Sequence, residues 1–248
     1  MATIQAYESH SATNWRAAIE GCLLVGLGAM LLRKTWDGQL ALYIHPRYIG
    51  LILVTAIALL VIGAFRLWLV GSDAAVNGGQ ARRGNAVYAL LLAPLLLGVL
   101  IPAKPAGSAL VDPAQLNVAR RGYTPRSALA DADSAKWTLF EWMFARYTLK
   151  PEEAQGKPVD VIGFVYHGPE QAADEFYVVR YTLACCVADR SGVSLPVKFA
   201  NANTLPDDTW VQVTGTIESR PGNGAQELVV INSQVTPVAQ PAEPYLYP

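Results

Sequence analysis

The stretch "YIGLILVTAIALLVIGAFRLWLV", residues 48–70, carries no charge over its first 18 residues, from Tyr48 to Phe65. About 20 apolar residues in a helix cross the roughly 30 Å hydrocarbon core of a bilayer. Because this stretch has no polar face, a buried helix of a soluble protein explains it poorly. Arg66 and Trp68 suit the lipid–water interface near its end. The sequence therefore predicts a transmembrane helix over residues 48–70.

Two further apolar runs flank this helix. Residues 84–103 contain no charge, and a membrane helix tolerates Pro94 as a kink. Residues 15–35 are less apolar, because Arg16 and Glu20 lie near their start. An acidic residue inside a membrane is costly and often functional, although Glu20 could also pair with Arg16 one helical turn away. The sequence thus predicts a tail of residues 1–14 and a transmembrane domain of residues 15–103, with spans at about 15–35, 48–70 and 84–103.

Charge divides the chain where the apolar runs end. Residues 1–102 carry seven Lys/Arg and four Asp/Glu, a net of +3, whereas residues 103–248 carry twelve and sixteen, a net of −4. An acidic second half argues against nucleic acid as a partner. The basic residues near the predicted spans divide equally between the two sides, four against four, so the positive-inside rule leaves the orientation open.

The second half alternates in the manner of β-strands. The predicted strands are residues 158–168, 175–189, 192–199, 209–218 and 227–238, separated by turn sequences such as "RSG", "LPDD" and "RPGNG". The second strand is long enough to bend across two sheets, which favours an OB-like five-stranded Greek-key barrel over a plain β-sandwich. A short amphipathic helix at residues 136–149 is expected to cap the core. The barrel domain is thus predicted at residues 136–238, between a linker (104–135) and a Pro-rich tail (239–248) whose Tyr245 and Tyr247 are expected to be exposed.

Common catalytic motifs are missing from the sequence. It contains no Gly-rich phosphate loop, no G-x-S-x-G and no H-E-x-x-H. His10, His45 and His167 are scattered over the tail, a loop and a turn, so nearby positions do not form a metal cluster built from histidines. We therefore expect a protein that is not an enzyme.

Two of the three cysteines are adjacent, in "RYTLACCVAD" at residues 180–189. In a strand, Cys185 and Cys186 would point to opposite faces, with Asp189 on the face of Cys185 and Arg180 on the face of Cys186. The thiols could pack as small hydrophobic side chains, or they could form a strained, redox-active disulfide. They could also bind a transition metal such as zinc with Asp189 or His167, while a permease or a second copy of the chain completes the shell. In the redox and metal interpretations, Arg180 would lower a thiol pKa.

Several uncommon motifs occur in the second half of the chain and around the predicted spans. They are "RYTLACCVADRSGVSLPV" (180–197), then "WVQVTGTIE" (210–218), with "GFVYHG" (163–168), "LYIHPRYIGLI" (42–52) and "LIPAKPAGS" (100–108). These motifs and their order resemble the YcgQ family of bacterial membrane proteins. The likeness runs from about residue 15 to residue 238. It implies an accessory subunit beside a multi-spanning permease, and a frequent metal-handling neighbour in the family implies transition-metal transport. Many relatives carry a Cys/His-rich tract between the second and third helices, but residues 71–85 here lack such ligands.

Together these patterns predict a non-enzymatic, multi-pass protein of the plasma (inner) membrane, with three membrane helices followed by a soluble OB-like barrel. Its partners would be a permease subunit and the lipid bilayer, and a homo-oligomer is compatible with the sequence. Its recognition or ligand site would contain Cys185, Cys186 and Asp189, with Arg180, His167 and the membrane-embedded Glu20 as further candidates. The alternatives are a thiol-redox protein or sensor that uses the paired cysteines, and a scaffold without chemistry.

Overall fold

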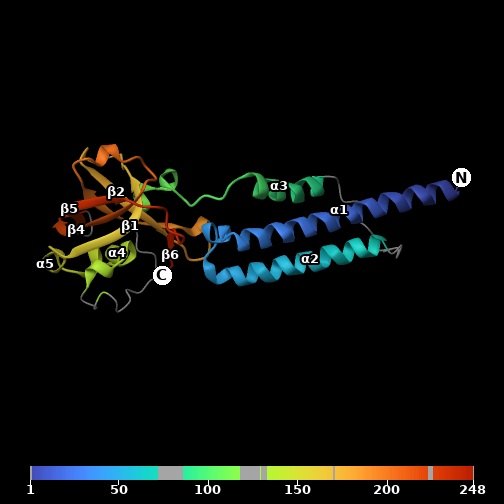
Figure 1. Ribbon diagram of the computed structural model, residues 1–248, viewed down its shortest axis with the longest axis horizontal. Helices are drawn as coiled ribbons and strands as arrows, with labels where there is room; N and C mark the ends of the chain where they lie inside the picture. The colour runs from blue at the N-terminus through green and yellow to red at the C-terminus, as the bar shows by residue number, and fades with distance from the viewer. Residues whose placement is uncertain are drawn as a thin grey trace. The chain divides into compact units, whose positions relative to one another are not determined.

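A computed structural model describes residues 2–71, 86–117, 129, 133–169, 171–222 and 226–247 (Figure 1). The chain divides into two compact units. The helical unit comprises residues 1–41 and 46–104, and the barrel unit comprises residues 42–45 and 105–248. The segment Leu42–His45 therefore belongs to the barrel unit, although it lies between two helices of the other unit in the sequence.

The helical unit contains α1 (Ala2–Trp36), α2 (Ile49–Gly71) and α3 (Ala86–Leu100). The backbone of α1 is helical from Ala2, so the segment expected as a tail continues the first helix. Helix α3 contains Pro94, as expected for a kinked membrane helix. Short 3-10 turns at Gln39–Leu42 and Pro46–Tyr48 lie between α1 and α2.

One segment of the described helices is long and apolar enough to cross a membrane, Pro46–Val70, with mean hydropathy 2.6. Only 11% of its most apolar window is buried, whereas the core helix of a soluble protein is mostly buried. The described part of α3 has 15 residues, fewer than the roughly 20 that a span requires. In α1, Glu20 and the pair Arg33 and Lys34 bound the apolar part. The structure thus supports one of the three predicted spans, the one expected at residues 48–70.

Glycines bring α1 and α2 into backbone contact. A Cβ added at Gly63 would lie 2.9 Å from the carbonyl oxygen of Gly21, and one added at Gly21 would lie 3.2 Å from the carbonyl oxygen of Gly63. Seven residues further along α1, a Cβ added at Gly28 would lie 2.9 Å from the carbonyl oxygen of Ala56 in α2. Small residues at such crossings let membrane helices associate through close packing.

Five strands form the barrel: β1 (Pro158–Tyr166), β2 (Glu175–Thr182), β3 (Ser191–Lys198), β4 (Trp210–Arg220) and β5 (Glu227–Pro237). Their order is β1-β4-β5-β3-β2, and β2 pairs back with β1, which closes the sheet. Strands β3 and β5 pair in parallel, and the other four barrel pairs are antiparallel. The five-stranded closed barrel predicted from the sequence is therefore confirmed, and its strand order is that of a Greek key.

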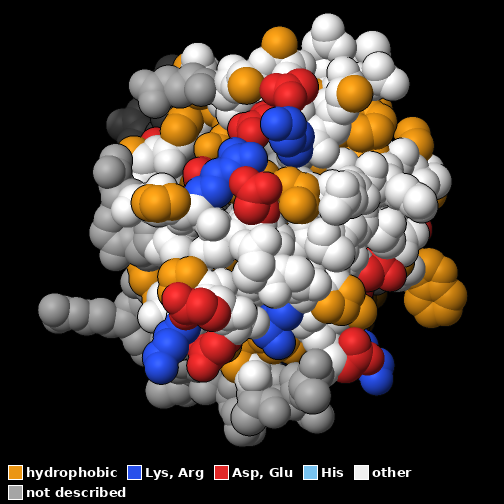
Figure 2. Space-filling view, turned by 90° about the vertical axis from the view of Figure 1, so that its left-hand side faces the viewer, with side chains coloured by type: hydrophobic (Ala, Val, Ile, Leu, Met, Phe, Trp, Pro, Cys, Tyr) orange, Lys and Arg blue, Asp and Glu red, His pale blue; other side chains and the backbone are white. Residues whose placement is uncertain are grey.

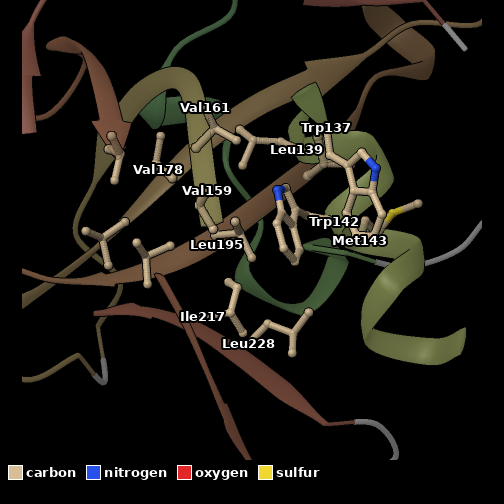
Figure 3. Close-up of a cluster of buried hydrophobic side chains, with 14 of the residues drawn as sticks. Trp137, Leu139, Trp142, Met143, Val159, Val161, Val178, Leu195, Ile217 and Leu228 are labelled. Carbon is tan, nitrogen blue, oxygen red and sulfur yellow. The ribbon is translucent and has the colours of Figure 1, made fainter. Parts of the chain in front are cut away.

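Apolar side chains from alternating strand positions fill the barrel, and α4 (Leu139–Thr148) packs onto this core (Figure 3). A capping box between Thr138 and Glu141 fixes the start of α4. The helix buries Trp142 among barrel side chains such as Leu195. This agrees with the amphipathic helix expected at residues 136–149. The remaining short helices are α5 (Pro151–Ala154) and the 3-10 turns Ser108–Leu110, Pro113–Gln115, Ser134–Lys136, Val187–Asp189 and Ala202–Thr204.

Two expectations about the barrel unit are wrong. Strand β2 ends at Thr182, not at residue 189, because the chain turns away from the sheet before the paired cysteines. The C-terminal tail is ordered: β6 (Tyr245–Leu246) pairs in parallel with β2. Tyr245 is only 2% exposed, since its ring packs in a second apolar cluster with Tyr181 and Leu183.

Candidate functional site

The paired cysteines lie on a turn that follows β2. The chain leaves the strand after Thr182 and enters the 3-10 turn Val187–Asp189. Because this backbone is not a continuous strand, alternation does not separate the two side chains, and the sulfur atoms of Cys185 and Cys186 are 3.6 Å apart. Cys185 is exposed and Cys186 is half-buried. The expectation that the two thiols face opposite sides is therefore wrong.

Asp189 holds this turn in place. Its Oδ2 accepts a hydrogen bond from the backbone N–H of Cys185 at 2.7 Å, and its Oδ1 accepts one from the N–H of Ala184 at 3.2 Å. Partial burial alone would raise the pKa of Asp189, but hydrogen bonds from the Cys185 thiol and from nearby backbone N–H groups outweigh it and lower the pKa. Asp189 therefore lies beside Cys185, on the side where strand alternation had placed it.

The same carboxylate makes the Cys185 thiol a weaker acid than an ordinary cysteine. Hydrogen bonds to Asp189 and to Cys186, with smaller contributions from desolvation and from the negative charge of Asp189, raise the pKa of the Cys185 thiol to about 11. The thiolate is the form that attacks electrophiles and binds metals. Cys185 is thus a neutral thiol at physiological pH, although it is exposed.

The cysteine turn also pairs with the segment between α1 and α2. Ile44 and Cys186 form an antiparallel β-bridge. The N–H of His45 donates to the carbonyl oxygen of Cys185 at 2.9 Å, and the N–H of Val187 donates to that of Tyr43 at 2.8 Å. We call Leu42–His45 the connector segment. Sequence reasoning missed this contact, because no local pattern links residues 42–45 to residues about 140 positions later.

Strand alternation suggested that Arg180 lies on the face of Cys186 and lowers a thiol pKa, but its guanidinium group binds the C-terminal tail instead. Its Nε donates to the carbonyl oxygen of Pro244 at 3.2 Å, and its Nη2 donates to that of Glu243. Burial lowers the pKa of Arg180, and the nearby Tyr247 and Glu243 oppose this shift. These hydrogen bonds hold the C-terminal tail against the barrel.

His167 lies at the opposite end of β2 from the cysteine turn. Its Nδ1 is 2.7 Å from Oδ1 of Asp207, and its Nε2 is 3.2 Å from the carbonyl oxygen of Ala202. The antiparallel pairing of Tyr166 with Tyr177 places His167 near the start of β2. Eight strand residues at about 3.3 Å each then separate it from the turn that carries the cysteines. The structure therefore does not bring His167 to the cysteine pair.

Glu20 lies in the helical unit and contacts α3. The hydroxyl of Tyr88 donates to Glu20 Oε1 at 3.3 Å. This hydrogen bond gives the carboxylate a polar partner from another helix. The side chain of Arg16, the alternative partner expected for Glu20, lies outside the described part of the chain.

Metal ligands do not converge in the described part of the chain. Within it, no group of three or more His, Cys, Asp or Glu side chains is placed to hold an ion. Cys185, Cys186 and Asp189 are close together, but the carboxylate is occupied by backbone N–H groups. A metal at this turn would therefore need ligands from outside the described residues, such as the permease or second copy that the sequence interpretation invoked. Of the ligand-poor tract expected at residues 71–85, residues 72–85 lie outside the described residues.

Replacing Asp189 with asparagine should make Cys185 react faster with iodoacetamide. If the thiol pKa falls from about 11 towards 9, the thiolate fraction at pH 8 rises about a hundredfold, while the lower basicity of the thiolate removes about tenfold of its intrinsic reactivity. We expect a net increase of about tenfold, measured by mass spectrometry of the labelled peptide. Asp174→Asn, which removes an exposed carboxylate paired with Lys198, is the control and should leave the rate unchanged. An unchanged rate in Asp189→Asn would contradict the assigned role of Asp189.

The chain matches two consecutive family descriptions. Residues 19–117 match the DUF1980 N-terminal domain, and residues 136–248 match the DUF1980 C-terminal domain. It is 27% identical over 100 residues to "UPF0703 protein YcgQ" of Bacillus subtilis, covering 39% of this chain and 35% of that protein. It is 31% identical over 101 residues to "Putative two-component membrane permease complex subunit" of Streptococcus mutans serotype c, covering 40% of this chain and 36% of that protein.

Each of these alignments spans about a third of the relative's length. The two DUF1980 domains, in contrast, cover most of this chain in their expected order, one largely on the helical unit and one on the barrel. The YcgQ relative agrees with the family resemblance that the sequence suggests. The chain therefore belongs to the YcgQ/DUF1980 family.

Proposed function

We propose that the protein is an accessory subunit of a membrane permease system, in which membrane helices tether a soluble barrel. The observation that carries the membrane part is the exposed apolar surface of α2 and α3. Leu51 and Phe65 of α2 are 66% and 56% exposed, and Leu100 of α3 is 73% exposed. Soluble monomers rarely expose contiguous apolar surfaces of this kind, so lipid or another membrane protein is the fitting environment.

The permease part of the proposal is supported by the name of the Streptococcus mutans relative. We further propose that α1 and α3 also span the bilayer of the plasma membrane, which makes the protein multi-pass. The glycine contacts between α1 and α2 and the hydrogen bond from Tyr88 to Glu20 support a packed helical bundle. On the face of the barrel unit shown in Figure 2, acidic and basic side chains are interspersed, which favours a protein partner over nucleic acid.

The test is co-purification from native membranes. Full-length tagged protein should remain in the membrane pellet after extraction with alkaline carbonate, dissolve in mild detergent, and carry a multi-spanning permease with it at near-stoichiometric yield. Recovery in the carbonate supernatant would contradict the membrane assignment. Membrane retention without any permease would contradict the accessory role. The protein would then be interpreted as a scaffold without chemistry.

A thiol-redox protein is the second candidate, because the sulfur atoms of Cys185 and Cys186 are 3.6 Å apart and one of them is exposed. Oxidation by a disulfide such as oxidised glutathione would join the two sulfurs and release two reduced thiols. Such a bond would alter the turn that pairs with the connector segment. Alkylation of both thiols without prior reduction, in protein from freshly lysed cells, would contradict this candidate.

The proposal includes no metal. The carboxylate beside the two thiols is already engaged by hydrogen bonds from the backbone N–H groups of Ala184 and Cys185. A metal-related role therefore finds no support in the geometry of the cysteine turn.

A further inference from the structure

A cavity of about 350 Å³ lies within the helical unit, between α1 and α3. The two helices run in the same direction where they touch. A Cβ added at Gly26 would lie 3.2 Å from Cδ2 of Leu95, and one added at Gly98 would lie 2.5 Å from Sδ of Met30. The cavity extends from this contact to the C-terminal ends of both helices, and all its lining residues belong to the described part of the chain.

The α3 side of the cavity is apolar and accessible. Val99 and Ile101 both line the cavity and are exposed. Glycine has no Cβ, and Gly26, Ala29 and Gly98 therefore leave space between the two helices. An apolar chain of a ligand can reach this wall.

Two cations from the last turn of α1 line the same cavity. The Arg33 side chain is 81% exposed, and its Nε is 3.6 Å from Oδ2 of Asp37. The terminal nitrogens of the guanidinium group carry four further N–H donors. Lys34 Nζ donates to Oε1 of Gln39 at 2.9 Å, and an ammonium group has three donors. Since Asp37 is the acidic residue of the lining, the cavity carries a net charge of +1.

The C-terminal end of a helix attracts cations by itself, so Arg33 and Lys34 alone do not indicate a ligand. The independent observation is the apolar cavity that reaches the same two side chains. A soluble anion needs no apolar wall, and a hydrocarbon needs no cations. A phospholipid carries a phosphate and an acyl chain in one molecule, and basic pockets between membrane helices bind lipid headgroups.

Trp36 marks the level of the cavity in the bilayer. Its side chain is exposed, and it follows Lys34 by two residues. Tryptophan is enriched at the lipid–water interface, where the phosphates of the lipids lie. The more apolar part of α1 precedes this turn, so an acyl chain that extends from the cavity along α1 and α3 would enter the hydrocarbon region.

We propose that this cavity binds an anionic phospholipid. The phosphodiester lies against Arg33 and Lys34, and an acyl chain lies against Met30, Leu95 and Val99. The lining charge of +1 complements phosphatidylglycerol, which carries one negative charge, better than phosphatidylethanolamine, which has no net charge. This inference rests on the proposed membrane location of the helical unit and does not depend on a permease.

The test is native mass spectrometry of the full-length protein, released from a neutral detergent after titration with lipid. The probes are dioleoylphosphatidylglycerol, dioleoylphosphatidylethanolamine and glycerophosphoglycerol, which is the first headgroup without acyl chains. We expect phosphatidylglycerol to bind about fivefold more tightly than phosphatidylethanolamine, and the free headgroup not to bind at the same concentrations. Equal binding of the two lipids would overturn recognition of the anionic charge. Binding of the free headgroup as tight as that of the lipid would show a phosphate site and overturn the lipid site.

Charge variants separate this site from general attraction to anionic lipid. Lys34→Gln should weaken phosphatidylglycerol binding about fivefold. Lys104→Gln is the matched control, because it removes the same charge from an exposed residue just after α3 that does not line the cavity, and it should leave the affinity unchanged. Equal losses in the two variants would overturn the site. If Lys34→Gln aggregates in detergent, Arg33→Gln removes the other, highly exposed cation and carries the same expectation.

Ala29→Phe tests the apolar part of the site. Ala29 is an exposed residue of the lining, so the larger ring would occupy the cavity and leave both cations in place. We expect a severalfold loss in affinity for phosphatidylglycerol. Unchanged affinity in this variant would overturn the placement of the acyl chain between α1 and α3.

Carbonate extraction separates this inference from the proposed function. Recovery of the protein in the carbonate supernatant would overturn the membrane location and the lipid site together. A protein that stays in the membrane pellet but binds the two lipids equally would overturn the lipid site alone, whether or not a permease co-purifies.

Discussion

Replacing Gly163 with alanine should destabilise the barrel by about 2–3 kcal/mol. The added Cβ would lie 2.6 Å from the carbonyl oxygen of Val179 and 2.8 Å from Cγ2 of Val178. Strand β2 cannot retreat from this contact, because Val179 pairs with Phe164 of β1 on one side and with Ser194 of β3 on the other. Gly163 pairs with Val211 of β4 and lies one residue before Phe164, where β1 begins to pair with β2 as well; glycine is typical of such barrel corners.

Gly192→Ala is the matched control for this prediction. Its added Cβ would lie 2.7 Å from Cδ2 of Leu116, which is the end of a side chain that can rotate away, and 3.8 Å from Cε1 of Tyr181, which is an ordinary van der Waals contact. We expect a loss of less than about 1 kcal/mol. Urea unfolding of the full-length protein in detergent, followed by hydrogen exchange of the peptides that cover β1 and β2, measures both. Equal losses in the two variants would contradict the assignment of Gly163 to a barrel corner.

The sequence predicts much of this fold because its strongest signals are local. Alternating apolar residues and Gly/Pro-rich turns give five strands whose observed ends differ from the predicted ends by only a few residues, apart from that of β2. The charge-free run from residue 48 to residue 65 gives α2 for the same reason. The predicted end of β2 is wrong because the strand-like residues of "EFYVVRYTLACCVAD" give no local signal for a stop at Thr182, whereas Asp189 folds the chain back by accepting hydrogen bonds from the N–H groups of Ala184 and Cys185.

The candidate sites were less predictable, since they depend on contacts between distant segments. The pairing of Ile44 with Cys186 needs the folded barrel, and no motif in either segment indicates it. Among the described residues, buried donor atoms of Trp142, Arg146 and Gln171 lack a hydrogen-bond partner, and no motif in the sequence marks these residues. The sequence shows which side chains carry hydrogen-bonding groups. Only the packing of the folded chain shows which of those groups have a hydrogen-bond partner.

Replacing Tyr245 with alanine should have the largest effect in the barrel unit, a loss of about 3–5 kcal/mol in local stability. The buried ring would leave a cavity beside Tyr181 and Leu183. The hydroxyl also joins two distant segments: it accepts a hydrogen bond from the N–H of Ala106 at 2.8 Å and donates one to the carbonyl oxygen of Leu42 at 3.0 Å. We expect the amides of residues 42–46, 105–110 and 243–247 to lose hydrogen-exchange protection together, while β4 and β5 keep theirs.

Tyr245→Phe separates the hydroxyl from the ring. It keeps the packing but leaves the N–H of Ala106 and the carbonyl oxygen of Leu42 without their partner, at a cost of about 1–3 kcal/mol. Exchange should then increase at residues 42–46 and 105–110, with little change at β6. If the connector segment exchanges equally in wild type and in both variants, Tyr245 does not anchor it, and the β-bridge between Ile44 and Cys186 and the contact of His45 with Tyr247 hold it instead. If the connector opens only in the variants, the C-terminal tail controls the contact between the cysteine turn and the chain that enters α2.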